Sequence, residues 1–132
     1  MLTEKFNFSK KERLKSKKEI YRIFNEGIFF YAEHIGVKFV ETINHKQYMH
    51  KVGISVPKRL FKLAVLRNKI KRRIRESYRL NKNIVYSTEN PLFLNFFFIY
   101  KSNEIKNNND IENEIIILLK KLQEYIIKKS DL

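Results

Sequence analysis

A nearly unbroken run of apolar residues from Leu92 to Tyr100 constrains the fold more than any other part of the sequence. Asn95 is its one polar member, and Pro91 immediately precedes it. The run is far too short to cross a bilayer, which takes about 20 apolar residues in a helix. It is typical of a strand that is buried on both faces. It therefore predicts a buried strand over residues 91–101.

Two further strands precede this one, and both alternate apolar and polar side chains with the period of two that a strand requires. The apolar positions are Ile35, Val37 and Phe39 in residues 34–42, and Val52, Ile54 and Val56 in residues 48–56. Turn-forming residues lie between the two segments, and Pro57 ends the second because it has no N–H for a ladder. We therefore expect a β-hairpin over 34–57.

Helical periodicity marks three other segments. A helix over 16–26 has Ser16 as its N-cap and Glu19 three residues later. A second helix is expected over 64–81, and a third over 111–129. The order α-β-β-α-β-α, with room for one extra short strand, predicts the α/β class, as a two-layer α+β fold in which helices pack on a small central sheet.

The chain length of 132 residues suits one domain spanning 1–132. Residues 1–15 are polar, basic and without periodicity, so we expect a loose basic arm there. The arm also lacks the apolar core of a secretory signal, which indicates a cytoplasmic protein without a membrane partner.

Positive charge is concentrated in one segment. The formal net charge is +14, and residues 58–82 contain eleven basic side chains against one acidic side chain. Six of the eight arginines lie in this segment, and Arg presents a planar fork of donors that matches a phosphate group. The distribution indicates a polyanionic partner, and nucleic acid is the first candidate.

The helix expected over 64–81 separates two kinds of side chain. One side carries an apolar i, i+4 stripe formed by Leu66, Ile70, Ile74 and Tyr78. The opposite side carries a polar sector formed by Asn68, Arg72, Arg75 and Arg79. The plain alternative is a solvated face, but the charges in this segment repel each other and exceed what solubility requires. We therefore predict that this face binds an anion.

Residues suited to catalysis or metal binding are sparse. The absence of cysteine excludes disulfides and Cys-containing zinc sites. The three histidines, His34, His45 and His50, form no His-x-His pair, and surface or filler roles are favoured over a pair across the hairpin. Three glycines are too few for a phosphate-cradling loop. We expect no catalytic residue and no metal ion bound by protein residues alone.

Two adjacent motifs resemble the protein subunit of bacterial ribonuclease P. The first is Gly53-Ile54-Ser55-Val56-Pro57-Lys58-Arg59, against the family pattern G-[LI]-S-V-x-K-[KR]. The second runs from Ala64 to Arg75 as A-V-L-R-N-K-I-K-R-R-I-R, against A-V-x-R-N-[RK]-x-K-R-x-x-R. The expected elements also follow the family's order over residues 12–129. One departure lies in 61–64, where families often have Gly-x-Ala, so the loop over 58–63 has no predicted conformation.

The resemblance implies an accessory subunit of a ribozyme endoribonuclease. In that family a large RNA with bound Mg²⁺ cleaves precursor tRNA, and the protein helps the RNA to recognise the 5′ leader. The partners would be ribonuclease P RNA and precursor tRNA, with no DNA. The family fold also implies a left-handed βαβ crossover through the basic helix, which runs against the usual right-handed rule.

The resemblance also implies roles for individual residues. The residues expected to contact the catalytic RNA are Arg67, Asn68, Lys69, Lys71, Arg72 and Arg75, with the basic pair Lys58 and Arg59 and, outside the motif, Arg79. The leader is expected in a cleft between the first helix and one face of the sheet, lined by Ile20, Phe24 and Lys38. Phe24 has a ring that can stack on a base, whereas Ile20 offers apolar contact only.

Two other classes of protein are weighed against this prediction. A ribosomal or RNA-chaperone protein would bind structured RNA without assisting cleavage. A DNA-binding helix-turn-helix module is disfavoured, because no helix and short turn precede the basic helix.

Overall fold

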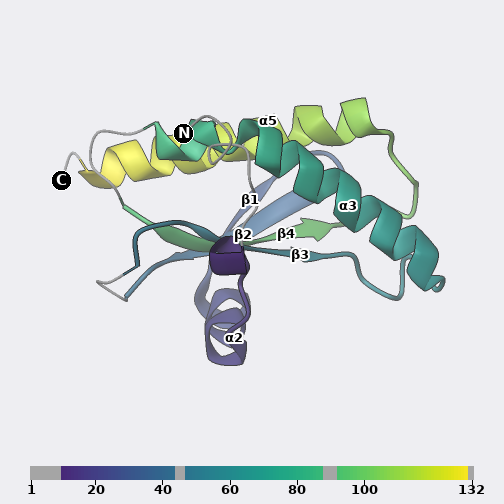
Figure 1. Ribbon diagram of the computed structural model, residues 1–132, viewed down its shortest axis with the longest axis horizontal. Helices are drawn as coiled ribbons and strands as arrows, with labels where there is room; N and C mark the ends of the chain where they lie inside the picture. The colour runs from purple at the N-terminus through teal and green to yellow at the C-terminus, as the bar shows by residue number, and fades with distance from the viewer. Residues whose placement is uncertain (1–9, 44–46, 88–91, 131–132) are drawn as a thin grey trace.

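A four-stranded sheet with helices on both faces makes up the fold (Figure 1). The computed structural model describes residues 10–43, 47–87 and 92–130. The elements are the 3₁₀ helix η1 (Lys10–Glu12), α2 (Lys17–Glu26), β1 (Ile28–Tyr31), β2 (Ile35–Glu41), β3 (Lys51–Ser55), α3 (Ala64–Asn81), α4 (Asn83–Tyr86), β4 (Leu94–Tyr100) and α5 (Asn108–Ser130). Helices α3 and α5 cover one face, and α2 lies against the other. The predicted fold class, helices packed on a small central sheet, is confirmed.

The strand order is β1-β2-β4-β3, so the predicted hairpin over 34–57 is wrong. Strand β4 lies between β2 and β3, antiparallel to the first and parallel to the second. The period of two identifies strands without identifying their partners, and β4, which is apolar on both faces, takes a central place. The extra short strand is β1, which forms an antiparallel hairpin with β2. The left hand of the β3–α3–β4 crossover stays a prediction.

The main core lies between the sheet and the helices α3 and α5. Alternate residues of β4 are fully buried on this face: Leu94, Phe96, Phe98 and Tyr100. The predicted stripe of α3 packs against them, with the Tyr78 ring 5.8 Å from that of Phe96 and 6.0 Å from that of Phe98. The apolar stripe therefore fixes which side of α3 faces the sheet.

The other face of β4 is only partly covered. Phe97 and Ile99 are half-buried, while Ile23 of α2 is fully buried in a small cluster with Leu14 and Val40. Helix α2 has ten residues and covers one part of the sheet. The apolar run is therefore buried on one face and half-open on the other, which leaves an accessible surface.

Local signals set the helix ends. The Ser16 hydroxyl accepts a hydrogen bond from the backbone N–H of Glu19 at 3.2 Å, as the capping pattern predicts. Helix α3 spans the predicted residues 64–81. Helix α5 begins three residues earlier than predicted, because the side-chain oxygen of Asn107 accepts from the N–H of Asp110 at 2.8 Å.

The predicted loose arm is wrong for residues 10–15. Leu14 donates its N–H to the carbonyl of Val52 at 3.0 Å, beside a bridge between Arg13 and Val52 at the edge of β3. Glu12 forms a buried ion pair with Lys82, with Nζ 2.9 Å from Oε1. This segment is thereby tied to both the sheet and the end of α3. Residues 1–9 of the predicted arm lie outside the described part of the chain.

His50 connects three elements at one end of the sheet. Its side chain is buried, with Nε2 donating to the carbonyl of Val85 at 3.0 Å and Nδ1 accepting from the N–H of Leu94 at 3.0 Å. Burial lowers the pKa of His50 from 6.5 to about 4, against the opposing effect of these two backbone hydrogen bonds. The ring is therefore neutral near pH 7.

We predict that His50 makes the free energy of unfolding decrease as the pH is lowered from about 6.5 to about 4. Above pH 6.5 the ring is neutral in the folded and the unfolded protein. Below pH 6.5 the ring is protonated in the unfolded chain but stays neutral in the folded chain, which lowers the free energy of unfolding by about 3 kcal/mol at pH 4. Urea unfolding across this range measures the effect. His50→Gln, which does not titrate, should show a shallower decline, and an equal decline in both proteins would contradict the prediction.

Candidate nucleic-acid interface

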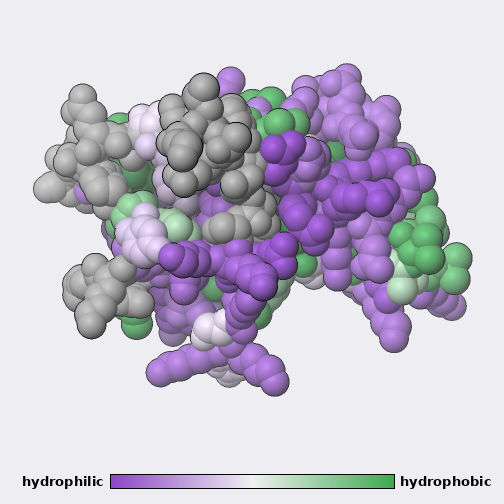
Figure 2. Space-filling view, viewed as in Figure 1, coloured by the Kyte–Doolittle hydropathy of each residue, from purple (hydrophilic) through white to green (hydrophobic). Residues whose placement is uncertain are grey.

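The exposed side of α3 forms the first basic surface, and Figure 2 shows hydrophilic side chains gathered over this helix. Asn68, Lys69, Arg72 and Arg75 are exposed. Within the described residues, no carboxylate lies within 4.0 Å of the charged groups of Lys69, Arg72 or Arg75. Their donors are therefore available to an external anion, which an Arg fork can bind with two hydrogen bonds.

Two other predicted arginines of α3 contact protein groups. The Arg67 guanidinium donates from Nη1 to the carbonyls of Phe61 at 2.7 Å and Lys62 at 2.8 Å. Arg79 forms an ion pair with Glu76 one turn away. Arg73, which was not predicted to bind RNA, donates to the carbonyl of Lys106 at 2.5 Å. The basic face thus divides into Arg72 and Arg75, which are exposed, and arginines that also hold the fold.

The Arg67 contacts help to define the loop before α3, whose conformation the sequence leaves open. Residues 58–60 form a turn in which Leu60 donates its N–H to the carbonyl of Pro57 at 3.1 Å. Lys58 and Arg59 are exposed on this turn, and Lys71 is half-buried at the edge of the helix face. The predicted basic pair therefore lies on the loop that leads from β3 into α3.

The second surface lies on the opposite face of the sheet, where the structure brings together the predicted cleft residues. Phe24 is 41% exposed, and its ring centroid lies 5.4 Å from that of Phe97 on β4. The Lys38 ammonium donates to the carbonyl of Phe24 at 2.7 Å and lies 5.9 Å from the centre of its ring. Ile20 is half-buried against the cluster around Ile23. The partly exposed ring of Phe24 and the ammonium group of Lys38 thus lie beside each other on this face.

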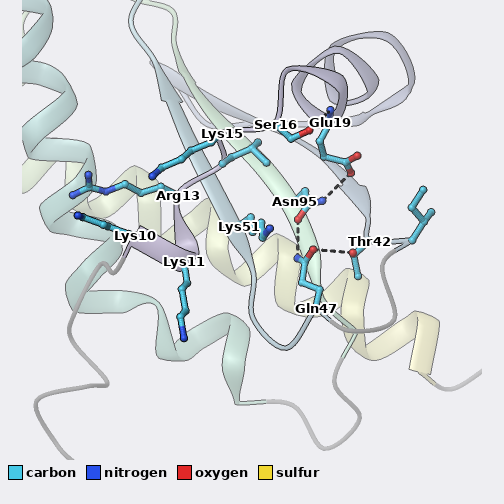
Figure 3. Close-up of a pocket in the computed structure, with 12 residues that line it drawn as sticks. Lys10, Lys11, Arg13, Lys15, Ser16, Glu19, Thr42, Gln47, Lys51 and Asn95 are labelled. Carbon is cyan, nitrogen blue, oxygen red and sulfur yellow. Dashed lines mark hydrogen bonds between the residues drawn. The ribbon is translucent and has the colours of Figure 1, made fainter.

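A pocket of about 320 Å³ adjoins this position (Figure 3). It lies between η1, the start of α2, and residues at or near the ends of β2, β3 and β4. Five of the described residues that line it are basic: Lys10, Lys11, Arg13, Lys15 and Lys51. None was predicted as a site residue, although the sequence carries the signal: seven basic side chains among residues 1–18.

A chain of hydrogen bonds forms one wall of the pocket (Figure 3). Asn95 donates to the Glu19 carboxylate at 2.8 Å, Gln47 donates to the Asn95 carbonyl oxygen at 2.8 Å, and Thr42 donates to the Gln47 carbonyl oxygen at 2.9 Å. The hydrogen bond from Arg22 lowers the pKa of Glu19, so the carboxylate stays ionised. Among the described residues that line the pocket, Glu19 is the one acidic side chain, so positive charge dominates there.

Within residues 10–43, 47–87 and 92–130, no group of three or more His, Asp or Glu side chains could hold a metal ion. No helix of the same residues is long and apolar enough to cross a membrane.

The fold and the two surfaces define a small α+β protein with basic side chains on both sides of its sheet. Residues 8–123 match the family model described as Ribonuclease P. Because the match covers most of its 132 residues, the chain belongs to the ribonuclease P protein family. Membership links the chain to the ribonuclease P complex, a hydrolase, and to tRNA processing.

Curated relatives and solved structures agree with this family. The ribonuclease P protein component of Porphyromonas gingivalis is 33% identical over 109 residues, covering 81% of this chain and 80% of that protein. The protein component of Petrotoga mobilis is 35% identical over 121 residues, covering 88% and 95%. The RNase P protein from Thermotoga maritima superposes with a TM-score of 0.68 at 26% identity, covering 83% of this chain and 96% of that chain. A Staphylococcus aureus RNase P protein mutant with defective mRNA degradation activity has a TM-score of 0.68 at 29% identity, covering 83% and 86%.

We predict that Arg67 and Arg72 differ in their effect on stability. Arg67→Ala removes two charge-assisted hydrogen bonds to loop carbonyls and should lower the free energy of unfolding by about 1.5–3 kcal/mol. Arg72→Ala alters an exposed side chain and should change it by less than about 0.5 kcal/mol. Urea unfolding of the free protein measures both, and equal losses would show that the Arg67 contacts do not hold the loop.

Proposed function

We propose that this chain is the protein component of ribonuclease P, which binds the catalytic RNA and the 5′ leader of precursor tRNA and assists removal of that leader. The observation that carries the proposal is the presence of two basic surfaces on opposite faces of one sheet. One is the exposed side of α3, and the other is the partly open face beside α2. Two separate surfaces suit a protein that contacts two RNA molecules at once.

The α3 surface is proposed to bind the catalytic RNA. Arg72 and Arg75 offer exposed guanidinium groups, while Lys58 and Arg59 extend the charge along the loop. Arg67 holds that loop, so its contribution to RNA binding includes the position of the basic pair. Phosphate contacts from such groups give affinity that falls as salt concentration rises.

The face beside α2 is proposed to bind the leader. Leader RNA is single-stranded, and such strands are bound by basic grooves that carry aromatic rings for stacking. Phe24 provides the ring, with Lys38 beside it. The adjoining pocket supplies five cations, which suit the phosphates of the same strand.

The cleavage chemistry is proposed to belong to the RNA and its Mg²⁺, with the polypeptide contributing no catalytic residue. The two histidines among the described residues, His34 and His50, both form hydrogen bonds with groups of the protein. His50 is buried and neutral near pH 7, and His34 Nδ1 lies 2.8 Å from the Glu114 carboxylate. The protein is proposed to act in the cytoplasm, where tRNA is processed. A ribosomal or RNA-chaperone role without cleavage is the competing function.

The first test is reconstitution with the cognate catalytic RNA. Protein and RNA together should remove the leader faster at low Mg²⁺ than the RNA alone, because the protein binds the leader and offsets phosphate repulsion. Gel analysis of labelled precursor tRNA measures the rate. Cleavage by the protein alone would contradict the accessory role, and no acceleration at any Mg²⁺ concentration would favour the competing function.

The second test measures the salt dependence of binding to the catalytic RNA. Arg72→Ala and Arg75→Ala should each weaken binding and reduce the slope of log affinity against log salt by roughly 0.7–0.9, because each removes one phosphate contact. Filter binding at several salt concentrations gives the slope. Ile117→Ala, at an exposed position of α5, is the control. Slopes equal to wild type would show that these arginines do not contact phosphates.

The third test separates leader binding from tRNA binding. Phe24→Ala should reduce holoenzyme affinity for precursor tRNA by about 1–3 kcal/mol, the contribution of one stacked base, and leave mature tRNA affinity unchanged. Tyr21→Ala is a matched control, because Tyr21 lies on the same helix, is 71% exposed and is outside the cluster that packs on the sheet. Equal losses for precursor and mature tRNA would remove Phe24 from the leader contact.

A further inference from the structure

An aromatic pair lies on the same face of the sheet as Phe24, beyond the part that α2 covers. Phe29 and Tyr31 alternate along β1 and pack edge to face, with ring centroids 4.5 Å apart at 83°. The Lys101 ammonium lies 4.2 Å from the centre of the Phe29 ring and 4.9 Å from that of Tyr31. We call these three residues the β1 platform. Tyr31 is 60% exposed, so burial does not account for its aromatic side chain.

A glycine lets the Phe29 ring lie across the neighbouring strand. A Cβ at Gly36 would come within 2.3 Å of Cζ of Phe29, closer than atoms of a packed structure approach. The same arrangement recurs at Gly53, where a Cβ would come within 2.3 Å of the Phe97 ring. Two glycines of the sheet thus leave space for two rings on this face, one beneath the Phe24 contact and one in the platform.

The ammonium group of Lys101 in the platform can bind an anion. Among the described residues, no carboxylate lies within 4.0 Å of Lys101. Glu33, in the turn after β1, has its carboxylate 4.0 Å from the His34 ring. Lys121 donates to the Tyr31 carbonyl at 2.7 Å and adds a second positive charge at this edge. A stacking ring beside two cations that have no carboxylate partner among the described residues matches the chemistry of single-stranded RNA.

Strand register makes the platform continuous with the proposed leader surface. Phe29 pairs with Lys38, the residue that contacts Phe24, and Gly36 pairs with Ile99, two residues beyond Phe97 on β4. Along β4, Asn95 lines the basic pocket and Phe97 packs against Phe24. Ile99, two residues further, pairs with Gly36, over which the Phe29 ring of the platform lies. The basic pocket, the Phe24 contact and the platform ring therefore follow one another along one face of the sheet.

We propose that the β1 platform stacks a leader nucleotide beyond the one that contacts Phe24, with Lys101 binding an adjoining phosphate. The inference rests on the proposed leader-binding function and adds a second stacking position to it. Leaders long enough to reach the platform gain affinity from it, and shorter leaders do not.

Leader length provides the test. Holoenzyme affinity is measured for mature tRNA and for precursor tRNAs whose leaders increase by one nucleotide. Wild type should gain affinity a second time, at the length that reaches the platform. Tyr31→Leu, which keeps an apolar side chain without a π-face, should remove that second gain, weakening long leaders about 5- to 150-fold. Tyr31→Phe should retain it, since the ring remains, and Ile117→Ala should match wild type.

A spectroscopic readout locates the contact independently of affinity. A 2-aminopurine placed at successive leader positions should show stacking-dependent quenching at one long-leader position in wild type, lost in Tyr31→Leu and kept in Tyr31→Phe. Gly36→Ala, which displaces the Phe29 ring, should weaken the same signal.

The outcomes separate this inference from the function on which it rests. If wild type binds precursor and mature tRNA equally, the proposed leader-binding function fails. If Phe24→Ala loses leader affinity while Tyr31→Leu matches wild type at every length, the platform alone is overturned. Altered self-association of free Tyr31→Leu protein, with unchanged leader binding, would assign the rings to a protein contact and also overturn it.

Discussion

The parallel pairing of β4 with β3 is the constraint on which the rest of the structure depends. A chain that must return to the start of a neighbouring parallel strand has to cross one face of the sheet, and a helix is the usual crossover. Helix α3 is that crossover, and it buries the stripe that contains Ile70, Ile74 and Tyr78 against β4. Its opposite side is thereby turned to solvent, which presents Arg72 and Arg75 outward.

The same arrangement leaves the other sheet face partly open. Helices α3 and α5 bury most of one face, whereas α2 is short and covers the second face around Val40 and Phe97. Polar contacts then hold the edges of this open face. The Glu12–Lys82 ion pair fixes η1 beside β3 and connects it to the end of α3, and His50 joins β3, α4 and β4. Breaking a buried ion pair of this kind is costly because it leaves an uncompensated charge, so the pocket cations on η1 have a firm support.

Features that depend on neighbouring residues in the sequence could be predicted, and features that depend on distant ones could not. The Ser16 cap, the limits of α3 and its two faces follow from local patterns, and they agree with the structure. The strand pairing did not follow, because the period of two is the same whether β2 meets β3 or β4. The early start of α5 at residue 108 came from one side-chain cap in a segment whose composition favours a loop.

In the candidate site, too, local patterns predict some features, whereas others depend on residues far apart in the sequence. Helical spacing predicts the exposure of Arg72 and Arg75, because the apolar stripe alone determines it. Spacing does not show that Arg67 contacts loop carbonyls, since Phe61 and Lys62 lie outside the helix. It also does not bring Lys10 and Lys51 into one pocket, because that proximity needs η1 to pack on β3. The basic composition of residues 1–15 predicts positive charge there, but it does not predict where in the fold that charge lies.

Site-directed cross-linking in the assembled complex tests the central claim that the two faces contact different RNAs. The chain has no cysteine, so a single cysteine introduced by Arg75→Cys or Lys51→Cys can carry a photoreactive group at one known place. In the complex of protein, catalytic RNA and precursor tRNA, the group at position 75 should cross-link to the catalytic RNA. The group at position 51 should cross-link to the leader. Cross-links from both positions to the same RNA molecule would contradict the account.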